Sequence, residues 1–196
     1  MRLFLDICTG IGLSAAAGLR PFLPALVAGA LAGANLGIDF DGTDFAFLES
    51  GAFLLVMLVL LVATIVAQRR WGIEAVESGP LGAALAGISI ALGAVLFAAT
   101  LQDHGYAWWP GIIAGAAIAA VAQLAVRSLF ARIRARADRG VSESLVVFQD
   151  LGGLVAAAAA ILVPPISLLL AGFLGTLYAG GRRRGEKKYA GLRILR

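Results

Sequence analysis

The residue with the clearest capacity for chemistry is Arg20, the one charged side chain deep within a long apolar block. An arginine at the centre of a membrane helix costs about 2.5–3.5 kcal/mol on insertion scales, so a charge there is a functional hypothesis by default. Its planar guanidinium matches carboxylate and phosphate groups. We therefore predict that Arg20 supplies the charge of an anion-binding site.

The prolines near Arg20 predict how such a site is built. Pro21 and Pro24 interrupt the block that contains Arg20, and Pro164 and Pro165 interrupt a second long block. Proline breaks a helix interior but suits the first position of a helix. Pro21 and Pro165 thus predict two helix starts, whose unpaired N–H groups and positive dipole ends attract anions. We expect the two starts to meet at mid-depth around Arg20, and we assign Arg20, Pro21, Pro24, Pro164 and Pro165 to substrate binding.

A structural role for Arg20 is the alternative. Its side chain would then reach a lipid headgroup, or pair with a carboxylate to hold helices together. The carboxylates that would pair with it are those of Asp6, Glu49 and Asp150. The same three are candidates for ion ligands or helix caps, and a cap at the membrane surface is the favoured role for Asp6 and Asp150.

Composition indicates what must position these residues. Of 196 residues, 60% are hydrophobic and only 14% are charged, and the mean hydropathy is +0.91. Soluble domains carry about 25% charged residues. We predict an all-α integral membrane protein with three full transmembrane helices and two proline-broken segments. The five apolar blocks cover about 3–34, 47–67, 81–101, 110–129 and 151–180.

Charge in the loops predicts the topology. Basic residues follow the second, fourth and fifth blocks, whereas segments 35–48 and 102–109 contain no Lys or Arg. The positive-inside rule favours one cytoplasmic side for the three basic regions, which requires the fifth block to fold back as a re-entrant hairpin. The first block either spans or is re-entrant. We divide the chain into one transmembrane domain, 1–181, and a basic cytoplasmic tail, 182–196.

The two broken blocks resemble each other. Residues 6–21 align without gaps on residues 150–165, each beginning with Asp and ending with Pro. Three intervening spans would place them on opposite membrane faces, as an inverted repeat of the kind common in transporters. GxxxG spacings at Gly29/Gly33 and Gly111/Gly115 allow close helix contact within the chain or in a homo-oligomer.

Other functional classes find no support in the residues. The chain has one cysteine and one histidine, and it lacks hydrolase, P-loop and dinucleotide-binding motifs. We therefore expect no enzyme activity, no cofactor and no metal site. The net charge of +4 reads as a topology signal, so we expect no nucleic-acid partner.

A family resemblance lies at Gly12–Pro24 and the Ala-Leu-Val-Ala-Gly29 that follows. This stretch resembles a bacterial membrane family known only as domain of unknown function 4126, which implies a membrane location and no assigned activity. Residues 20–29 are also similar to the arginine–proline re-entrant motif of the DedA-type lipid transporters. That similarity implies opposed re-entrant hairpins, although Val163-Pro164-Pro165 replaces the motif's acidic and second arginine positions.

We expect a small transporter or channel with a midplane site for an anionic solute or a lipid phosphate group. Its location would be the bacterial inner (cytoplasmic) membrane, with several spans and a cytoplasmic C-terminus. The partners would be the bilayer and anionic lipid headgroups, which the basic loop and tail attract. The rival hypothesis is a scaffold or accessory protein that acts through that loop and tail without transporting anything.

Overall fold

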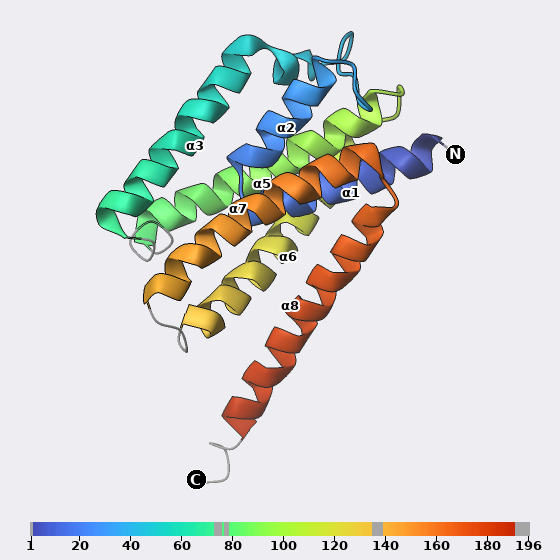
Figure 1. Ribbon diagram of the computed structural model, residues 1–196. Coiled ribbons are helices and arrows are strands. Elements are labelled where there is room, and N and C mark those ends of the chain that lie inside the picture. Colours follow the sequence, from blue (N-terminus) through green and yellow to red (C-terminus); the bar gives the residue numbers. More distant parts are fainter. Residues whose placement is uncertain (1, 73–75, 77–78, 135–138, 191–196) are drawn as a thin grey trace.

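A computed structural model describes residues 2–72, 76, 79–134 and 139–190, and every regular element within these ranges is a helix (Figure 1). The elements are α1 (Arg2–Leu19), α2 (Phe22–Ala32), the short 3-10 helix η1 (Ala46–Glu49), α3 (Gly51–Trp71), α5 (Gly79–Gln102), α6 (Trp109–Arg134), α7 (Arg139–Leu162) and α8 (Ile166–Ala190).

Helices α3, α5 and α6 confirm the three uninterrupted segments predicted from the sequence. In the described residues, these three and α1 are long and apolar enough to cross a membrane. Helix α3 leaves much of its apolar surface exposed, for example Leu55, Leu58 and Val62. An apolar surface of this extent requires a lipid or protein partner. These helices are compatible with a multi-pass membrane protein.

The first block breaks where the prolines predict. Helix α1 ends at Leu19, and α2 begins at Phe22 directly after Pro21, whose φ is −65°. The chain then folds back, because Arg2 before the break and Gly37 after it line the same cavity. Figure 1 shows α2 running back toward the end of the bundle where the N-terminus lies.

The fifth block also breaks at its prolines, but its arms are longer than we predicted. Helix α7 begins at Arg139, ahead of the predicted fifth block, which starts at about residue 151. Helix α8 continues to Ala190, into the predicted tail. The outer end of each helix is polar, so it was not counted in an apolar block. The block therefore gave too short a length for both α7 and α8. Figure 1 shows α7 and α8 as a hairpin whose arms diverge from the turn at 163–165.

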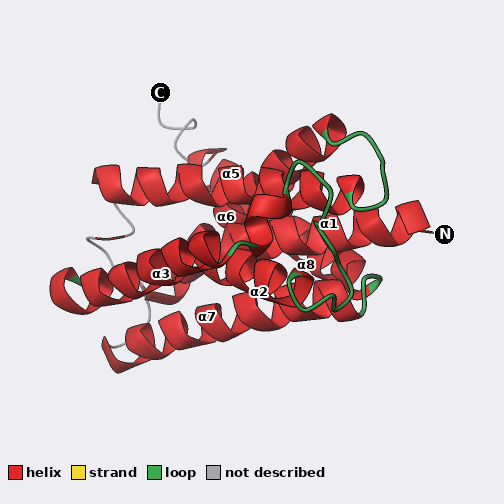
Figure 2. Cartoon of the chain, turned by 90° about the horizontal axis from the view of Figure 1, so that it is seen from above, coloured by secondary structure: helices red, strands yellow, loops and turns green. Residues whose placement is uncertain are grey.

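Helix α1 is the centre of the bundle. It packs against α5, α6, α7 and α8, and Figure 2 shows it with α5 on one side and α7 on the other. Small residues allow this, since a Cβ at Gly18 would lie 2.5 Å from the Ala119 carbonyl oxygen. The Ser14 hydroxyl donates a 2.8 Å hydrogen bond to the Gly93 carbonyl, which ties α1 to α5. The predicted Gly111/Gly115 contact also forms within the chain, against α5.

The two ends of the bundle differ in charge. The acidic end contains the N-terminal turn of α1, loop 33–50, loop 103–108 and the α7–α8 turn. The basic end contains the last turns of α3 and α6, the first turns of α5 and α7, and the end of α8. Acidic side chains such as Asp41 and Asp44 gather at the first end, and Arg69 and Arg70 close α3 at the second.

Candidate functional site

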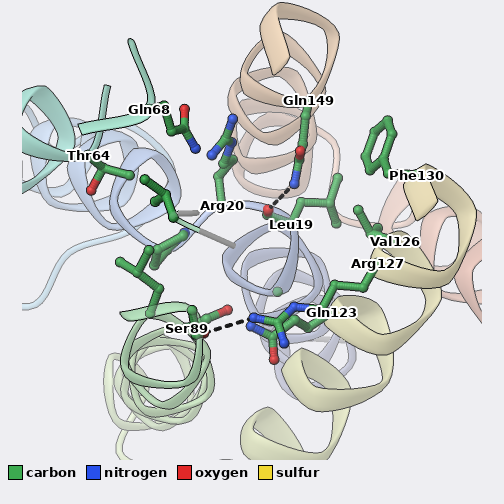
Figure 3. Close-up of a pocket in the computed structure, with 15 residues that line it drawn as sticks. Leu19, Arg20, Thr64, Gln68, Ser89, Gln123, Val126, Arg127, Phe130 and Gln149 are labelled. Atoms are coloured by element: carbon green, nitrogen blue, oxygen red, sulfur yellow. Dashed lines mark hydrogen bonds between the residues drawn. The ribbon is translucent and has the colours of Figure 1, made fainter. Parts of the chain in front are cut away.

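A cavity of about 70 Å³ lies beside the α1–α2 break, toward the basic end (Figure 3). We call it the Arg20 cavity. Arg20 and Pro21 line the cavity at the break, together with residues of five helices. These are Gly18 and Leu19 of α1; Thr64 and Gln68 of α3; Gly82, Leu85 and Ser89 of α5; Gln123, Val126, Arg127 and Phe130 of α6; and Gln149 of α7. Polar groups therefore converge here from segments far apart in the chain.

Arg20 is 9% exposed and forms an ion pair with Asp150 on α7, with 2.6 Å between Nε and Oδ1. This pair is the structural role that the sequence left open as an alternative. The contact lacks the alignment of a good hydrogen bond, because both Nε and Nη2 of Arg20 have no hydrogen-bond partner of normal geometry. Asp150 thus neutralises part of the charge of Arg20 but leaves Nη2 without a hydrogen-bond partner.

Two side chains around Arg20 hold helix ends in place. The Gln149 amide donates a 2.8 Å hydrogen bond to the Leu19 carbonyl, at the end of α1. The Arg127 guanidinium donates a 2.9 Å hydrogen bond to the Gly82 carbonyl, in the first turn of α5. Figure 3 shows Arg20 pointing toward Gln68 on one side of the cavity, with Arg127 on another. Two cationic groups therefore line one small cavity.

The structure does not bring the two proline breaks together, contrary to our expectation of a shared mid-depth site. Pro21 lines the Arg20 cavity, but Pro164 lines a different cavity at the acidic end. Pro165 precedes α8 in the same turn, and Pro24 is fully buried within α2. The reason is that the long arms of the fifth block carry its turn to the far end of the bundle.

The helix-cap interpretation of the three acidic candidates is wrong. Asp6 lies inside α1 and Asp150 inside α7. Glu49 ends η1, where its Oε1 accepts a hydrogen bond from the Phe40 backbone N–H. The cap of α3 is Ser50, whose hydroxyl accepts a 3.2 Å hydrogen bond from the Phe53 N–H.

A second cavity of about 360 Å³ lies at the acidic end, and we call it the Asp6 cavity. His104 Nδ1 lies 3.2 Å from Asp6 Oδ1 and 3.8 Å from Asp103 Oδ2. Burial raises the pKa of Asp103 above its ordinary value, although the positive form of His104 opposes the shift. His104 is exposed, and its contact with Asp6 connects loop 103–108 to α1.

Three carboxylates in loop 33–50 come close together among the described residues. Oxygens of Asp39, Asp41 and Glu49 lie within 4.8 Å of one another, which is near enough to share a cation. Asp39 Oδ1 and Glu49 Oε1 already accept backbone N–H groups, from Asp41 and Phe40. These hydrogen bonds account for the cluster, because Asp39 and Glu49 stabilise the backbone of the loop.

Sequence reasoning missed most of the polar lining of the Arg20 cavity. Gln68 and Arg127 read as residues near the ends of apolar blocks, and Gln149 fell outside the fifth block. Gln123 lies inside the fourth apolar block, at about 110–129. The usable signal was the placement of glutamines at the edge of apolar segments, where polar groups usually face the bundle interior.

The comparisons with known proteins bear on this arrangement at the level of the family. A family model described as "Domain of unknown function (DUF4126)" matches residues 7–182, which include the described lining of the Arg20 cavity and nearly all of the helices. The chain belongs to this family. Searches of the curated proteins and of the solved structures give no match. DUF4126 brings no assigned activity, so the function has to be argued from the site.

Proposed function

We propose that this DUF4126 protein is a small membrane transporter or channel whose Arg20 cavity binds an anionic solute or a lipid phosphate group. The observation that carries the proposal is the Arg20 guanidinium, which is buried, lines the cavity and has its Nη2 without a hydrogen-bond partner. A buried donor left without a partner costs about 1–3 kcal/mol, and more when it is charged. An oxyanion placed at Nη2 would remove that cost.

The charge balance supports an anion as the ligand. Arg20 and Arg127 contribute two positive charges and Asp150 one negative charge, so one positive charge is left over. Amide groups of Gln68 and Gln123 supply neutral donors in the same cavity. A volume of about 70 Å³ holds about two water molecules at their liquid volume. We therefore propose that the cavity receives the charged group of a solute or lipid rather than a large molecule as a whole.

The two hairpins support a transporter plan. The α1–α2 hairpin enters the bundle from the acidic end, and the α7–α8 hairpin enters from the basic end. Helices α3, α5 and α6 lie between the two hairpins in the sequence. This is the arrangement expected of an inverted repeat, in which opposed segments give access to a site from alternate sides. We propose that the α1–α2 hairpin is re-entrant and that the Arg20 cavity opens toward the basic end. The turn of the α7–α8 hairpin instead reaches the acidic end, because Pro164 lines the cavity there.

The same plan predicts a membrane orientation with the basic end in the cytoplasm of the bacterial inner membrane. In a Cys8→Ala background, a cysteine at Asp41 should react with an impermeant thiol reagent added outside intact cells. A cysteine at Arg70 should react only after the membrane is permeabilised. Both positions are exposed, so burial does not limit either reaction. Labelling of Arg70→Cys in intact cells would show that the basic end faces outward.

The functional test is flux into proteoliposomes. We expect purified protein to move at least one of a panel of labelled inorganic anions or fluorescent phospholipids faster than protein-free liposomes do. A chain lacking residues 182–196 should keep this flux, because the described lining of the Arg20 cavity comes from residues between 18 and 149. If no member of the panel moves and the truncation abolishes the cellular function, the scaffold hypothesis replaces transport.

A further inference from the structure

The Asp6 cavity has the opposite chemistry from the Arg20 cavity. Its polar lining includes the carboxylates of Asp6 and Asp103 and one guanidinium, that of Arg2. Apart from the imidazole of His104, two negative charges against one positive charge leave one negative charge over. The ligand expected here is therefore a cation.

One oxygen in this lining lacks a partner. Asp6 is 8% exposed, and its Oδ1 lies beside His104, but its Oδ2 is buried without a hydrogen-bond partner. A buried carboxylate oxygen is stabilised by a donor, and most strongly by a charged donor. The cavity that Asp6 lines is the space from which such a donor can come.

Two hydroxyl groups in the cavity are further acceptors for a ligand that donates hydrogen bonds. Thr9 donates to the Leu5 carbonyl at 3.0 Å, and Thr100 donates to the Phe97 carbonyl at 2.8 Å. With their protons engaged in their own helices, both hydroxyls offer only lone pairs to a ligand. The cavity thus presents acceptors from α1, α5 and loop 103–108.

The size and the remaining lining favour an organic cation over a bare metal ion. A volume of about 360 Å³ lies in the range of small-molecule sites, about 300–1,000 Å³. Leu5, Ile38 and Pro164 form an apolar wall that would contact carbon atoms. An ammonium group has three donors and no acceptor, which matches the acceptor-rich side.

We propose that the Asp6 cavity binds the ammonium group of an amine, with Asp6 Oδ2 as its main acceptor. The amine is either a small soluble molecule or the amine-bearing headgroup of a lipid. This site lies at the other end of α1 from Arg20 and needs no transport, so it stands apart from the anion proposal.

His104 provides a specific reporter, because it is the single histidine of the chain and touches Asp6. Protein with ¹⁵N-labelled histidine in detergent micelles would be titrated with ethanolamine at constant pH while the imidazole resonances are recorded. We expect a saturable shift with ethanolamine and none with ethylene glycol, which has a hydroxyl in place of the amine. Choline, which keeps the charge but has no N–H donor, should bind at least tenfold more weakly.

Asp6→Asn is expected to weaken ethanolamine binding at least tenfold, because the amide keeps the shape of the side chain but loses its charge. Asp41→Asn is the matched control, since Asp41 is exposed at the same end and does not line the cavity. An unshifted His104 spectrum of ligand-free Asp41→Asn, together with wild-type binding, would support the assignment. Equal binding by wild type and a folded Asp6→Asn, or a response to Zn²⁺ without one to ethanolamine, would overturn it.

Nanodiscs distinguish the two sources of the amine. If the ligand is a lipid headgroup, discs containing phosphatidylethanolamine should shift the His104 resonances relative to phosphatidylcholine discs, and free ethanolamine should add little. If the ligand is soluble, the two kinds of disc should give the same spectrum, and ethanolamine should shift both. No response to ethanolamine in micelles and none to either lipid would reject the proposal.

Discussion

Arg20→Gln should reduce anion affinity by about 10- to 100-fold and lower flux in proteoliposomes accordingly. A charge-assisted hydrogen bond contributes about 1.5–3 kcal/mol, and each 1.4 kcal/mol is a tenfold change in affinity. Glutamine keeps a donor in the cavity but removes the positive charge and the fork of the guanidinium. The measurement is the concentration dependence of flux for whichever anion or phospholipid the wild-type protein moves.

Asp150→Asn separates a binding role of Arg20 from a purely structural one. If the ion pair serves only to hold α1 against α7, removal of either partner should impair the protein in the same direction. If Arg20 binds the anion, loss of the competing carboxylate should increase the affinity, in the opposite direction from Arg20→Gln. Arg70→Gln is the control for surface charge, because Arg70 is exposed at the same end and does not line the cavity.

Equal losses in Arg20→Gln and Asp150→Asn would assign the pair to structure alone. Both variants should therefore be compared with wild type by thermal unfolding in the same detergent. A variant that unfolds at a much lower temperature reports on stability rather than on binding. An unchanged affinity in a stable Arg20→Gln protein would remove Arg20 from the anion site.

The helix breaks were predictable because proline acts locally. Pro21 restricts its own φ and lacks an N–H group, and these properties fix the end of α1 whatever surrounds it. The ion pair between Arg20 and Asp150 was one of three pairings that the sequence allowed. Choosing among them required the packing of α7 on α1, which depends on contacts between residues more than a hundred positions apart.

The depth of each break was not predictable by the same reasoning. Apolar block lengths measure how much of a helix lies in lipid, but α7 and α8 continue through polar residues at their outer ends. These additional turns carry Pro164 to the Asp6 cavity, away from Pro21. The local sequence predicts that a chain turns, whereas the neighbours of the turn decide where it lies.

Gly12→Ala should destabilise the fold by about 1–3 kcal/mol, the usual cost of overfilling a packed core. Gly12 lies where α1 meets both arms of the α7–α8 hairpin. A Cβ there would overlap Ala160 on α7 and the Ser167 hydroxyl on α8, and would lie 2.9 Å from Ser167 Cβ. Ala160 and Ser167 are both buried, so neither side chain has free space into which it can move.

Gly172→Ala is the control, because it should increase the free energy of unfolding rather than decrease it. Nothing lies within 4 Å of a Cβ at Gly172 in α8, and alanine stabilises a helix relative to glycine by about 0.5–1 kcal/mol. Unfolding of the two variants in mixed micelles, followed by tryptophan fluorescence, compares the same substitution in the two settings. If Gly12→Ala is as stable as Gly172→Ala, the hairpin does not pack on α1 at this point. The separation of the two proline breaks, which depends on that packing, would then lose its structural basis.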